Sequence, residues 1–543
     1  MFKRIIAPLL FLIFFVGCHQ KDSQNESIKN SLSSLYITIL PSQLDSILNN
    51  RDYKASADAI IVDENGDTLY DRPLKHIKTR GNGTWKSAKK PFTIKFHKSH
   101  NLRHLDKSKS FVLLANAEDE SHIRNAIAFD VSRAIDLPAP RYDYVSLYIN
   151  NQYKGLYQMT NKVEINKYAL DITDLERLNK EYNPLPLKEY NRFGVGIQNQ
   201  TSRRKGFLLD KSPDDITGGY LIEIIGFNSR YKRKDCGFVS DSGDLIVIRE
   251  PEHASKEEVD YIADFYNQME CALLDSTGYN LITGKHYSEY LDLVSFARSY
   301  ILNELLMNMD SGITSFFMYK NTNGRLMAGP SWDFDKSLNT KFWLGRYCCV
   351  NAIWAGSKTG YIGHESSGGI FYNLMRHEDF IKMVCKEWNT TVSPACHQLF
   401  ERGVWDSLVN ALSYDAKRDF ILTNNRRSSD YVLVTRRPLD FLQERMKFLD
   451  WLWSTNGEDV ISVADSIAEG RDCHDRFMNL YYRVGEPIIY PNMKKKKGEN
   501  APIPVFYISG TDSIIKNGTI LNHPAHLEMR EKEPIRNKVS FLN

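Results

Sequence analysis

Residues 303–335 read NELLMNMDSGITSFFMYKNTNGRLMAGPSWDFD, and the spacing of their apolar residues changes partway along. The apolar residues of 287–309 recur at helical intervals, and Gly312 suits the end of that helix. Residues 316–320 and 326–328 then flank Asn323-Gly324, a pair typical of a tight hairpin turn. This stretch therefore predicts that a helix and a two-stranded hairpin meet at one place in the fold.

The part of the chain before this stretch is rich in predicted strands. Runs of alternating or β-branched residues, several separated by Asn- or Gly-containing turns, predict strands at 35–40, 59–62, 68–70, 75–80, 92–96, 111–115, 145–149, 153–159 and 219–225. A helix is predicted at 121–135, where Ile123, Ile127, Val131 and Ile135 recur every four residues. Residues 166–216 are polar and interrupted by proline and glycine, so we expect a long loop or insertion there.

The second half of the chain is mainly helical in its pattern. Apolar residues at helical spacing predict further helices at 256–274, 371–388, 393–412 and 433–454. Strands followed by helices predict an α+β fold of two lobes, a strand-rich lobe over about 33–225 and a helical lobe over about 226–454. We expect residues 455–543 to form a small C-terminal appendage of unknown role.

The N-terminus has the pattern of an export signal. Lys3 and Arg4 precede an apolar run over residues 5–16 that is short for a membrane span. Gly17-Cys18 then resembles a bacterial lipoprotein cleavage site, which predicts a signal peptide over 1–18 and lipidation of Cys18. The polar residues 19–32 would form a flexible tether to a lipid-anchored protein of the bacterial cell envelope, on its periplasmic or surface face. The alternative is an ordinary secreted protein cleaved nearby.

Composition excludes several classes of protein. The chain has 543 residues, 42% hydrophobic and 25% charged, which is typical of a globular protein and not of a disordered chain or a fibre. A formal net charge of +3 gives no overall field to attract nucleic acid, so we expect no nucleic-acid partner. A single long apolar run excludes a multi-span membrane protein. The seven cysteines after Cys18 show no zinc-ligand spacing, which argues against a structural zinc site. Buried free thiols are the default expectation, and pairing of the adjacent Cys348 and Cys349 with other cysteines is the alternative.

Acidic residues flank the predicted hairpin on both sides. Asp310 precedes it, and Asp333 and Asp335 follow it, on one side of the chain if that segment is extended. Paired carboxylates form an oxygen-rich site suited to Mg²⁺ or Mn²⁺, beside which Asp310 would accept a proton. The alternative is structural, with Asp310 capping a turn and Asp333 binding a neighbouring arginine.

Several segments in order resemble one known family. They are RGNGTW at 80–85, KKPFTIKF at 89–96, FVLLAN at 111–116, IRNAIA at 123–128, APR at 139–141, YKGLY at 153–157, GGYLIE at 218–223, Asn303-Glu304, Asp310 and WDFD at 332–335. Together they resemble the spore coat protein H (CotH) kinase family, an atypical protein-kinase-like group. The resemblance covers residues from about 35 to 450, which is most of the chain.

This resemblance implies a two-lobed, atypical protein-kinase-like fold and transfer of phosphate from ATP to Ser or Thr of a protein outside the cytoplasm. Asp310 matches the family's proposed catalytic Asp, and Asp333 matches its metal-binding Asp. Asp335 would be a second metal ligand or would support the first. Phosphoryl transfer needs an aligned hydroxyl, a metal on the phosphates and cationic neutralisation, which fits these residue types. The acceptor protein is unknown.

Four basic residues are predicted to bind the phosphates of ATP. In order of preference they are Arg80, Lys162, Lys95 and Arg124. Arg80 precedes a Gly-Asn-Gly turn whose backbone N–H groups are able to cradle phosphate. The alternatives are a solvated Arg80, surface positions for the two lysines, and an Arg124 that binds a carboxylate and joins the lobes.

Two positions depart from the family pattern. Asn161 stands where the family commonly has Glu, and Ile225 where it commonly has Asp. Glu164, two positions after Lys162, is able to take over the missing Glu. The departures leave open a pseudokinase that binds nucleotide without transferring phosphate. A surface lipoprotein that binds glycan or protein and a metal-dependent hydrolase are further alternatives, although the hydrolase lacks a His-rich ligand set.

Overall fold

The computed structural model describes residues 32–190, 204–206, 208–226, 236–312, 314–338, 355, 369–423 and 431–454, together with four short strands beyond residue 500. The predicted signal peptide, Cys18 and all but the last residue of the tether lie outside the described residues. Most of 455–543 also lies outside the described residues. Within that segment, β14 (Val505–Ser509) pairs with β17 (His526–Arg530), and β15 (Ile515–Lys516) pairs with β16 (Thr519–Ile520).

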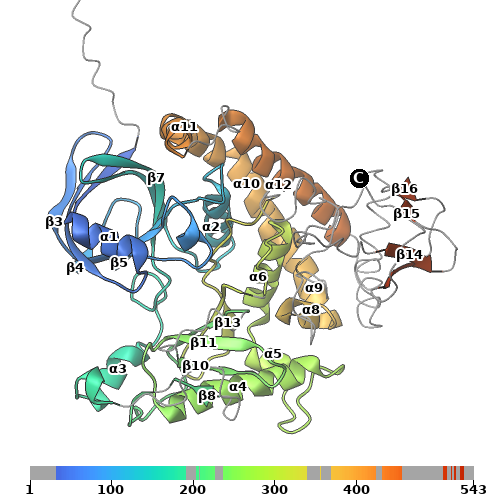
Figure 1. The fold of residues 1–543 in the computed structure, drawn as a ribbon. Helices are drawn as coiled ribbons and strands as arrows, with labels where there is room; N and C mark the ends of the chain where they lie inside the picture. Colours follow the sequence, from blue (N-terminus) through green and yellow to red (C-terminus); the bar gives the residue numbers. More distant parts are fainter. Residues whose placement is uncertain are drawn as a thin grey trace, which may run out of the picture.

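Seven strands close into a barrel at the N-terminal end of the fold, drawn in blue to teal in Figure 1. They are β1 (Ser33–Thr38), β2 (Ala55–Val62), β3 (Thr68–Thr79), β4 (Phe92–His100), β5 (Ser108–Leu114), β6 (Tyr142–Ile149) and β7 (Gln152–Asn161). The order is β1-β2-β3-β4-β5-β7-β6. Neighbouring strands are antiparallel except β1 and β6, whose parallel pairing closes the barrel.

Alternation of apolar and polar residues explains why these strands form a barrel. In β2 every second residue from Ala55 to Ile61 is buried, and the residues between them are exposed. The inward side chains fill the barrel with one core, which includes Leu35, Ile37, Ile61, Ile77, Ile94, Phe96, Phe111, Leu113, Leu147 and Met159. Helix α1 (Pro41–Asn49), which we had not predicted, adds the fully buried Ile47 to this core.

A second, six-stranded sheet follows the barrel in the chain. Its order is β13-β12-β9-β11-β10-β8, and it is formed by β8 (Arg204–Lys205), β9 (Tyr220–Ile224), β10 (Cys236–Val239), β11 (Leu245–Glu250), β12 (Phe316–Lys320) and β13 (Leu326–Ala328). The predicted hairpin at 316–328 is therefore confirmed, and it pairs with β9. The predicted lobe boundary near 225 falls inside this sheet, because β9 also pairs with β11. Helix α3 (Leu175–Tyr182) lies in the segment that we expected to be a loop.

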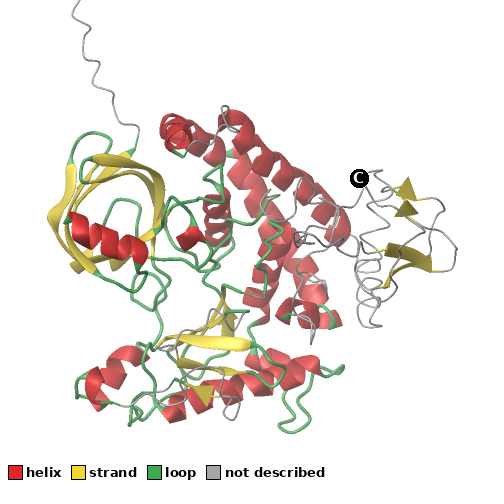
Figure 2. Cartoon of the chain, viewed as in Figure 1, coloured by secondary structure: helices red, strands yellow, loops and turns green. Residues whose placement is uncertain are grey.

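The remaining elements are helices, shown in red in Figure 2. They are α2 (Arg124–Ala134), α4 (Lys256–Leu274), α5 (Tyr287–Tyr290), α6 (Leu293–Leu305), α8 (Ile370–Leu374), α9 (Glu378–Glu387), α10 (Ser393–Glu401), α11 (Val404–Leu422) and α12 (Tyr431–Ser454). The fold is thus mixed α+β, with the barrel first and a largely helical C-terminal part. None of the described helices combines the length and apolarity that crossing a membrane requires.

Three predicted helices are each two helices in the structure. The first part of 287–309 ends at Tyr290, and Asp292 caps α6, because its Oδ1 accepts a hydrogen bond from the Ser295 backbone N–H at 2.8 Å. The segment 371–388 divides into α8 and α9, and 393–412 divides into α10 and α11 at Gly403. Gly403 has φ +60°, which glycine adopts at little cost.

A buried ionic contact joins the barrel to the helical part. The carboxylate of Asp419 on α11 lies 2.7 Å from Lys89 Nζ and accepts a hydrogen bond from the Leu156 backbone N–H at 2.9 Å. Both ionic side chains are nearly inaccessible to solvent. Gly155 has φ +115°, and a Cβ atom there would lie 2.2 Å from Asp419 Oδ1. The close approach of α11 to β7 therefore requires glycine at this position.

We expect Gly155→Ala to destabilise the protein by about 3 kcal/mol or more, because the new methyl group would displace a buried, paired carboxylate. Gly66→Ala is the matched control, since Gly66 has φ +92° but no described atom would lie within 4 Å of a Cβ added there. The control should lose only the stability that backbone strain costs a non-glycine residue at positive φ, about 1–2 kcal/mol. Urea denaturation of both variants measures the difference, and equal losses would contradict the packing argument.

Candidate functional site

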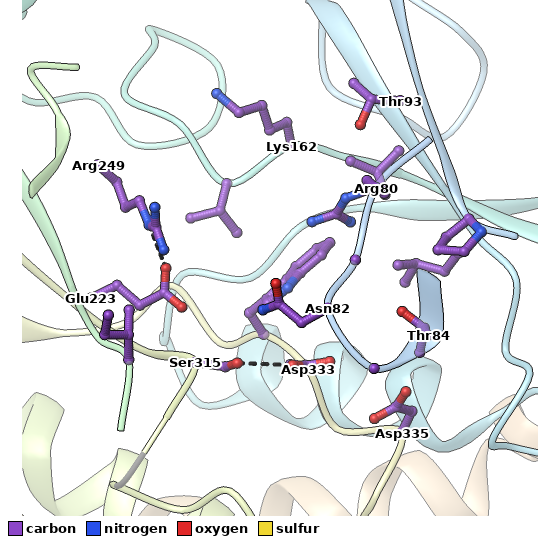
Figure 3. A pocket seen from close by; sticks show the side chains of 18 of the residues that line it. Arg80, Asn82, Thr84, Thr93, Lys162, Glu223, Arg249, Ser315, Asp333 and Asp335 are labelled. Atoms are coloured by element: carbon purple, nitrogen blue, oxygen red, sulfur yellow. Dashed lines mark hydrogen bonds and ion pairs between the residues drawn. The ribbon is translucent and has the colours of Figure 1, made fainter. Parts of the chain in front are cut away.

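A cavity of about 450 Å³ lies between the barrel and the six-stranded sheet. The barrel contributes the turn after β3, the end of β5 and the segment after β7, and the sheet contributes residues of β9, β10, β11 and β12. The loop that carries Asp310 and the segment 331–336 complete the wall. Figure 3 shows that the basic side chains Lys162, Arg249 and Arg80 lie on one side of the cavity and that Asp333 and Asp335 lie on the other.

Asp310, Asp333 and Asp335 all line this one cavity, as we expected. The reason is different from the one that we gave. Asp333 has φ +68° and so does not continue an extended strand, and its Oδ2 accepts a 2.8 Å hydrogen bond from Ser315 Oγ. Ser315 also has a positive φ, +55°. Strained backbone on both sides of this hydrogen bond is typical of a functional site.

The loop that carries Asp310 is fixed by asparagine side chains. Asn303 Oδ1 accepts a hydrogen bond from Asn308 Nδ2 at 3.0 Å, and Asn308 Oδ1 accepts one from the Asp310 backbone N–H at 3.2 Å. Gly312, with φ +64°, follows in the same turn. Asp310 is 7% exposed as a residue, and its carboxylate lies 3.9 Å from Lys336 Nζ. Asp310 is therefore held at the cavity wall beside a cation.

Negative charge accumulates at this end of the cavity. Burial and the neighbouring carboxylates of Asp333, Glu118 and Asp310 raise the pKa of Asp335 well above its usual value, and Lys336 opposes that shift. Burial lowers the pKa of Lys336, but the surrounding carboxylates outweigh it, so the net shift is upward. Glu118 Oε2 is buried and has no hydrogen-bond partner among the described residues. An additional cation would relieve both the repulsion and the unsatisfied oxygen.

These residues fit a magnesium ion that is shared with a phosphate ligand. Within the described residues no three His, Cys, Asp or Glu side chains are grouped so as to hold a metal ion by themselves. Mg²⁺ is commonly held by one or two carboxylates, with phosphate oxygens and water completing its shell. Asp333 and Asp335 provide oxygen donors of that kind, and the excess negative charge around Asp335 favours a divalent cation.

Arg80 lines the cavity from the turn after β3. Its guanidinium carbon is 5.2 Å from the centre of the Trp332 ring, and the Trp332 ring also stacks on the Phe129 ring, with 6.0 Å between the two ring centres. Burial lowers the pKa of the Arg80 guanidinium, while the charges of Asp333 and Glu223 counteract that shift. Arg80 forms no ion pair within the described residues. Its charge is therefore available to an anionic ligand, and stacking on Trp332 holds it in place.

The conformation of the turn that follows Arg80 is also fixed, by a glycine and by side-chain hydrogen bonds. Gly81 has φ +92°, and a Cβ atom there would lie 2.3 Å from Thr84 Oγ1. Arg51, which also lines the cavity, donates to the Gly81 carbonyl oxygen at 2.7 Å and to Asn82 Oδ1 at 3.1 Å, which anchors the turn. The Gly-Asn-Gly turn that we predicted to cradle phosphate thus lines the cavity in a fixed conformation.

Lys162 and Arg249 provide further positive charge on the basic side. Lys162 lines the cavity, is half exposed, and lies 3.6 Å from Glu164 Oε2. This is the pairing that we expected Glu164 to provide. Arg249 Nε donates to Glu223 Oε2 at 2.5 Å across neighbouring strands. Asn161 is buried and binds the backbone N–H and carbonyl of Asp106 at 2.9 and 2.8 Å, so it has a structural role instead of a place at the cavity.

Lys95 and Arg124 do not line the cavity. Lys95 lies on the outer face of β4, two residues beyond Thr93, which does line it. The Arg124 guanidinium is buried, pairs with Asp119 and donates to the Ser337 carbonyl oxygen at 2.9 Å. This is the structural alternative that we considered for Arg124. The geometry does not support a phosphate-binding role for either residue.

The start of α2 positions the acidic segment. Asn125 Oδ1 accepts a hydrogen bond from the Phe334 backbone N–H at 2.8 Å, and Arg124 binds Ser337 from the same helical turn. Asp119 fixes this turn, because its carboxylate accepts a hydrogen bond from the Arg124 backbone N–H at 3.0 Å and pairs with the Arg124 guanidinium. Asp333 and Asp335 are therefore placed by contacts that are far apart in sequence.

Sequence reasoning did not identify Glu118, Lys336 and Arg249 as residues of the cavity. Lys336 directly follows the predicted metal-binding segment, and that position was a usable signal. Glu118 and Arg249 carry charges that are common on protein surfaces, so nothing in the sequence distinguishes them. Their contribution follows only from the packing of the barrel against the second sheet.

Comparison with known proteins agrees with this geometry. The sequence model described as CotH kinase protein matches residues 77–449, well over half of the chain. No curated protein matches the chain significantly. The matched region contains Arg80, Asp310, Asp333 and Asp335, which all line the cavity. The chain belongs to the CotH kinase protein family.

Proposed function

We propose that this chain is a protein kinase that transfers phosphate from ATP to a Ser or Thr hydroxyl of another protein. The observation that carries the proposal is that Asp310, Asp333, Asp335 and Arg80 line one cavity between the barrel and the second sheet. In this proposal the barrel forms one lobe of an atypical kinase-like fold, the second sheet with the largely helical part forms the other, and nucleotide binds in the cavity between the barrel and the second sheet. Family membership supports the reaction type.

Asp310 is proposed to orient the acceptor hydroxyl. As the oxygen of that hydroxyl attacks the γ-phosphorus of ATP, its proton passes to the Asp310 carboxylate. The bond between the γ-phosphorus and the bridging oxygen breaks, and that oxygen leaves with ADP. Lys336 Nζ, 3.9 Å from Asp310 Oδ2, favours the ionised form of Asp310 that accepts the proton.

Arg80 and Lys162 are proposed to neutralise the phosphates. Arg80 is held against Trp332, so its guanidinium loses little freedom when a phosphate binds. Lys162 is more exposed and contributes mainly through its charge. Asp333 and Asp335 would hold Mg²⁺ or Mn²⁺, and such an ion, when bound, neutralises the charge that develops on the phosphate oxygens. The Ser315 hydrogen bond orients the Asp333 carboxylate for this role.

The location of the protein is also part of the proposal. The basic and apolar N-terminal residues and Cys18 support an exported lipoprotein that is anchored to a membrane of the bacterial cell envelope. The predicted tether would carry the kinase away from the bilayer. Metabolic labelling with a fatty acid, lost in Cys18→Ser, tests the anchor independently of the kinase activity.

A second candidate is a member of the family that binds nucleotide without transferring phosphate. Asn161 favours it, because this residue replaces a commonly acidic position and binds the backbone of Asp106, just before β5. Thermal stabilisation by ATP and Mg²⁺ without phosphate transfer would identify this case. A surface lipoprotein that binds glycan or protein would show neither effect.

We expect Asp310→Asn to lower phosphate transfer by about 100-fold or more while ATP binding persists, because the base is lost and the metal ligands remain. Transfer of labelled phosphate from ATP to a protein or peptide acceptor measures the first quantity. The shift of the melting temperature with ATP and Mg²⁺ measures the second. Full transfer activity in Asp310→Asn would exclude Asp310 as the base.

A further inference from the structure

Positive side chains gather on the barrel directly beside the cavity. Lys54, Lys75 and Lys95, with Lys162, form a cluster that we call the basic ledge. Lys54 lies just before β2, Lys75 is in β3, Lys95 is in β4 and Lys162 follows β7. Lys54, Lys75 and Lys162 are exposed, and Lys95 is partly buried. The ledge is thus assembled from four segments that are distant in sequence.

Strand register places the ledge next to the cavity. The pair Lys78 and Thr93 lines the cavity, and the next outward pair along the same two strands is His76 and Lys95. Two residues along a strand span roughly 7 Å. Figure 3 shows Thr93 on the same side of the cavity as Lys162, away from Asp335. A chain in extended conformation that leaves the cavity at this side would run directly over the ledge.

The charges of the ledge lie close enough to act on one another. Burial and then the positive charges of Lys54, Lys95, Lys78 and Lys75 lower the pKa of His76 to about 4, so His76 is neutral at pH 7. Burial and the charges of Lys162, Lys75 and Lys54 lower the pKa of Lys95, and Glu164 opposes that shift. Glu164 and Glu250, which accepts a hydrogen bond from the Ile165 backbone N–H, compensate part of the charge of Lys162. The lysines therefore repel each other, and an anionic partner would relieve that repulsion.

We propose that the basic ledge binds an acidic segment of the acceptor protein, so that the enzyme selects Ser or Thr residues flanked by Asp and Glu. This inference rests on the proposed kinase function, because it is the acceptor chain that must reach both Asp310 and the surface beside the cavity. Charge complementarity favours carboxylates, and the adjoining strands favour an extended peptide. The overall net charge of +3 gives no such preference, so the selectivity would be local.

The probe is a fluorescein-labelled peptide in which one Ser is flanked on both sides by Glu, compared with peptides that carry Asn or Lys in place of Glu. With the full chain at low ionic strength, we expect fluorescence anisotropy to show about tenfold tighter binding of the Glu peptide than of the Asn peptide, and this difference should shrink with added salt. Equal binding of the two peptides, or tightest binding of the Lys peptide, would overturn the inference.

The test variant is Lys54→Glu/Lys75→Glu, because neither residue lines the cavity. We expect it to bind the Glu peptide about tenfold more weakly and to keep its KM for ATP. The matched control is Lys382→Glu/Lys447→Glu, which makes the same change of charge on two lysines that are 65% and 72% exposed on helices α9 and α12. If the control binds the Glu peptide as weakly as the test variant does, the inference is overturned. It is also overturned if a single-stranded oligonucleotide binds more tightly than the Glu peptide and needs Lys54 and Lys75 to do so.

Binding of the peptide and transfer of phosphate to it are measured separately, so the two proposals fail differently. If the Glu peptide binds through the ledge but receives no phosphate, the kinase proposal fails and the binding surface remains. If phosphate reaches the Asn and Glu peptides with the same KM, the kinase proposal holds and the selectivity proposal is wrong.

Discussion

Asp333→Asn is expected to reduce phosphate transfer by about 10³-fold, the largest loss that we expect from any single side chain of the cavity. The substitution keeps the size of the side chain and its ability to accept the hydrogen bond from Ser315 Oγ, but it removes the negative charge that would hold the metal. The loss should therefore appear in catalysis and in nucleotide binding without a comparable loss of stability.

Two measurements separate these effects. With ATP and Mg²⁺ at about 100 times the dissociation constant, the unmodified protein should gain about 2.7 kcal/mol of stability, and Asp333→Asn should lose most of that gain. Asp71→Asn, an exposed change on β3, is the control and should behave like the unmodified protein. If Asp333→Asn keeps both the Mg²⁺-dependent stabilisation and phosphate transfer, then Asp333 is not the metal ligand.

Arg445→Met is expected to destabilise the protein by about 3–5 kcal/mol. Arg445 on α12 is fully buried, and its guanidinium pairs with the Glu304 carboxylate and donates to the Glu304 carbonyl oxygen at 3.1 and 3.0 Å. Removing the arginine would leave a buried carboxylate without its counter-charge. Since Glu304 lies in α6, shortly before the loop that carries Asp310, phosphate transfer should fall together with stability.

The control is Lys447→Met, on the same helix, where Lys447 is 72% exposed and pairs with Glu444. It should change stability by no more than about 0.5 kcal/mol. The double variant Glu304→Gln/Arg445→Met should recover part of the loss, because it removes both charges. Chemical denaturation measures all three, and an additive double variant would show that the two residues do not form a coupled pair.

Sequence patterns predicted the elements that depend on local periodicity. Alternating strands such as 59–62 and the four-residue spacing of Ile123, Ile127 and Val131 were both confirmed. Closure of the barrel was not predictable, because it depends on the parallel pairing of β1 with β6, more than 100 residues apart. The break before α6 was missed because α5 ends at Tyr290 and Asp292 caps the next helix with no proline or glycine between them.

The candidate site was predictable in its acidic residues and only in part in its basic ones. Asp310 and Asp333 were selected because carboxylates flank a tight hairpin, and both line the cavity. Arg80 and Lys162, the two basic residues that we preferred, both line the cavity, whereas Lys95 and Arg124 do not. Arg124 is occupied by Asp119, a contact that becomes visible only once the turn before α2 is folded.

The closed arrangement of the seven barrel strands leaves none of them with an unpaired backbone edge in the described structure. An open edge strand offers a row of N–H and C=O groups to which a neighbouring chain is able to add, and this is a common route to aggregation. Many copies of this chain held close together would therefore not add to one another by backbone pairing of the described barrel strands. If copies of the chain are crowded on a shared surface, contacts between their barrels would form through side chains and not through backbone hydrogen bonds.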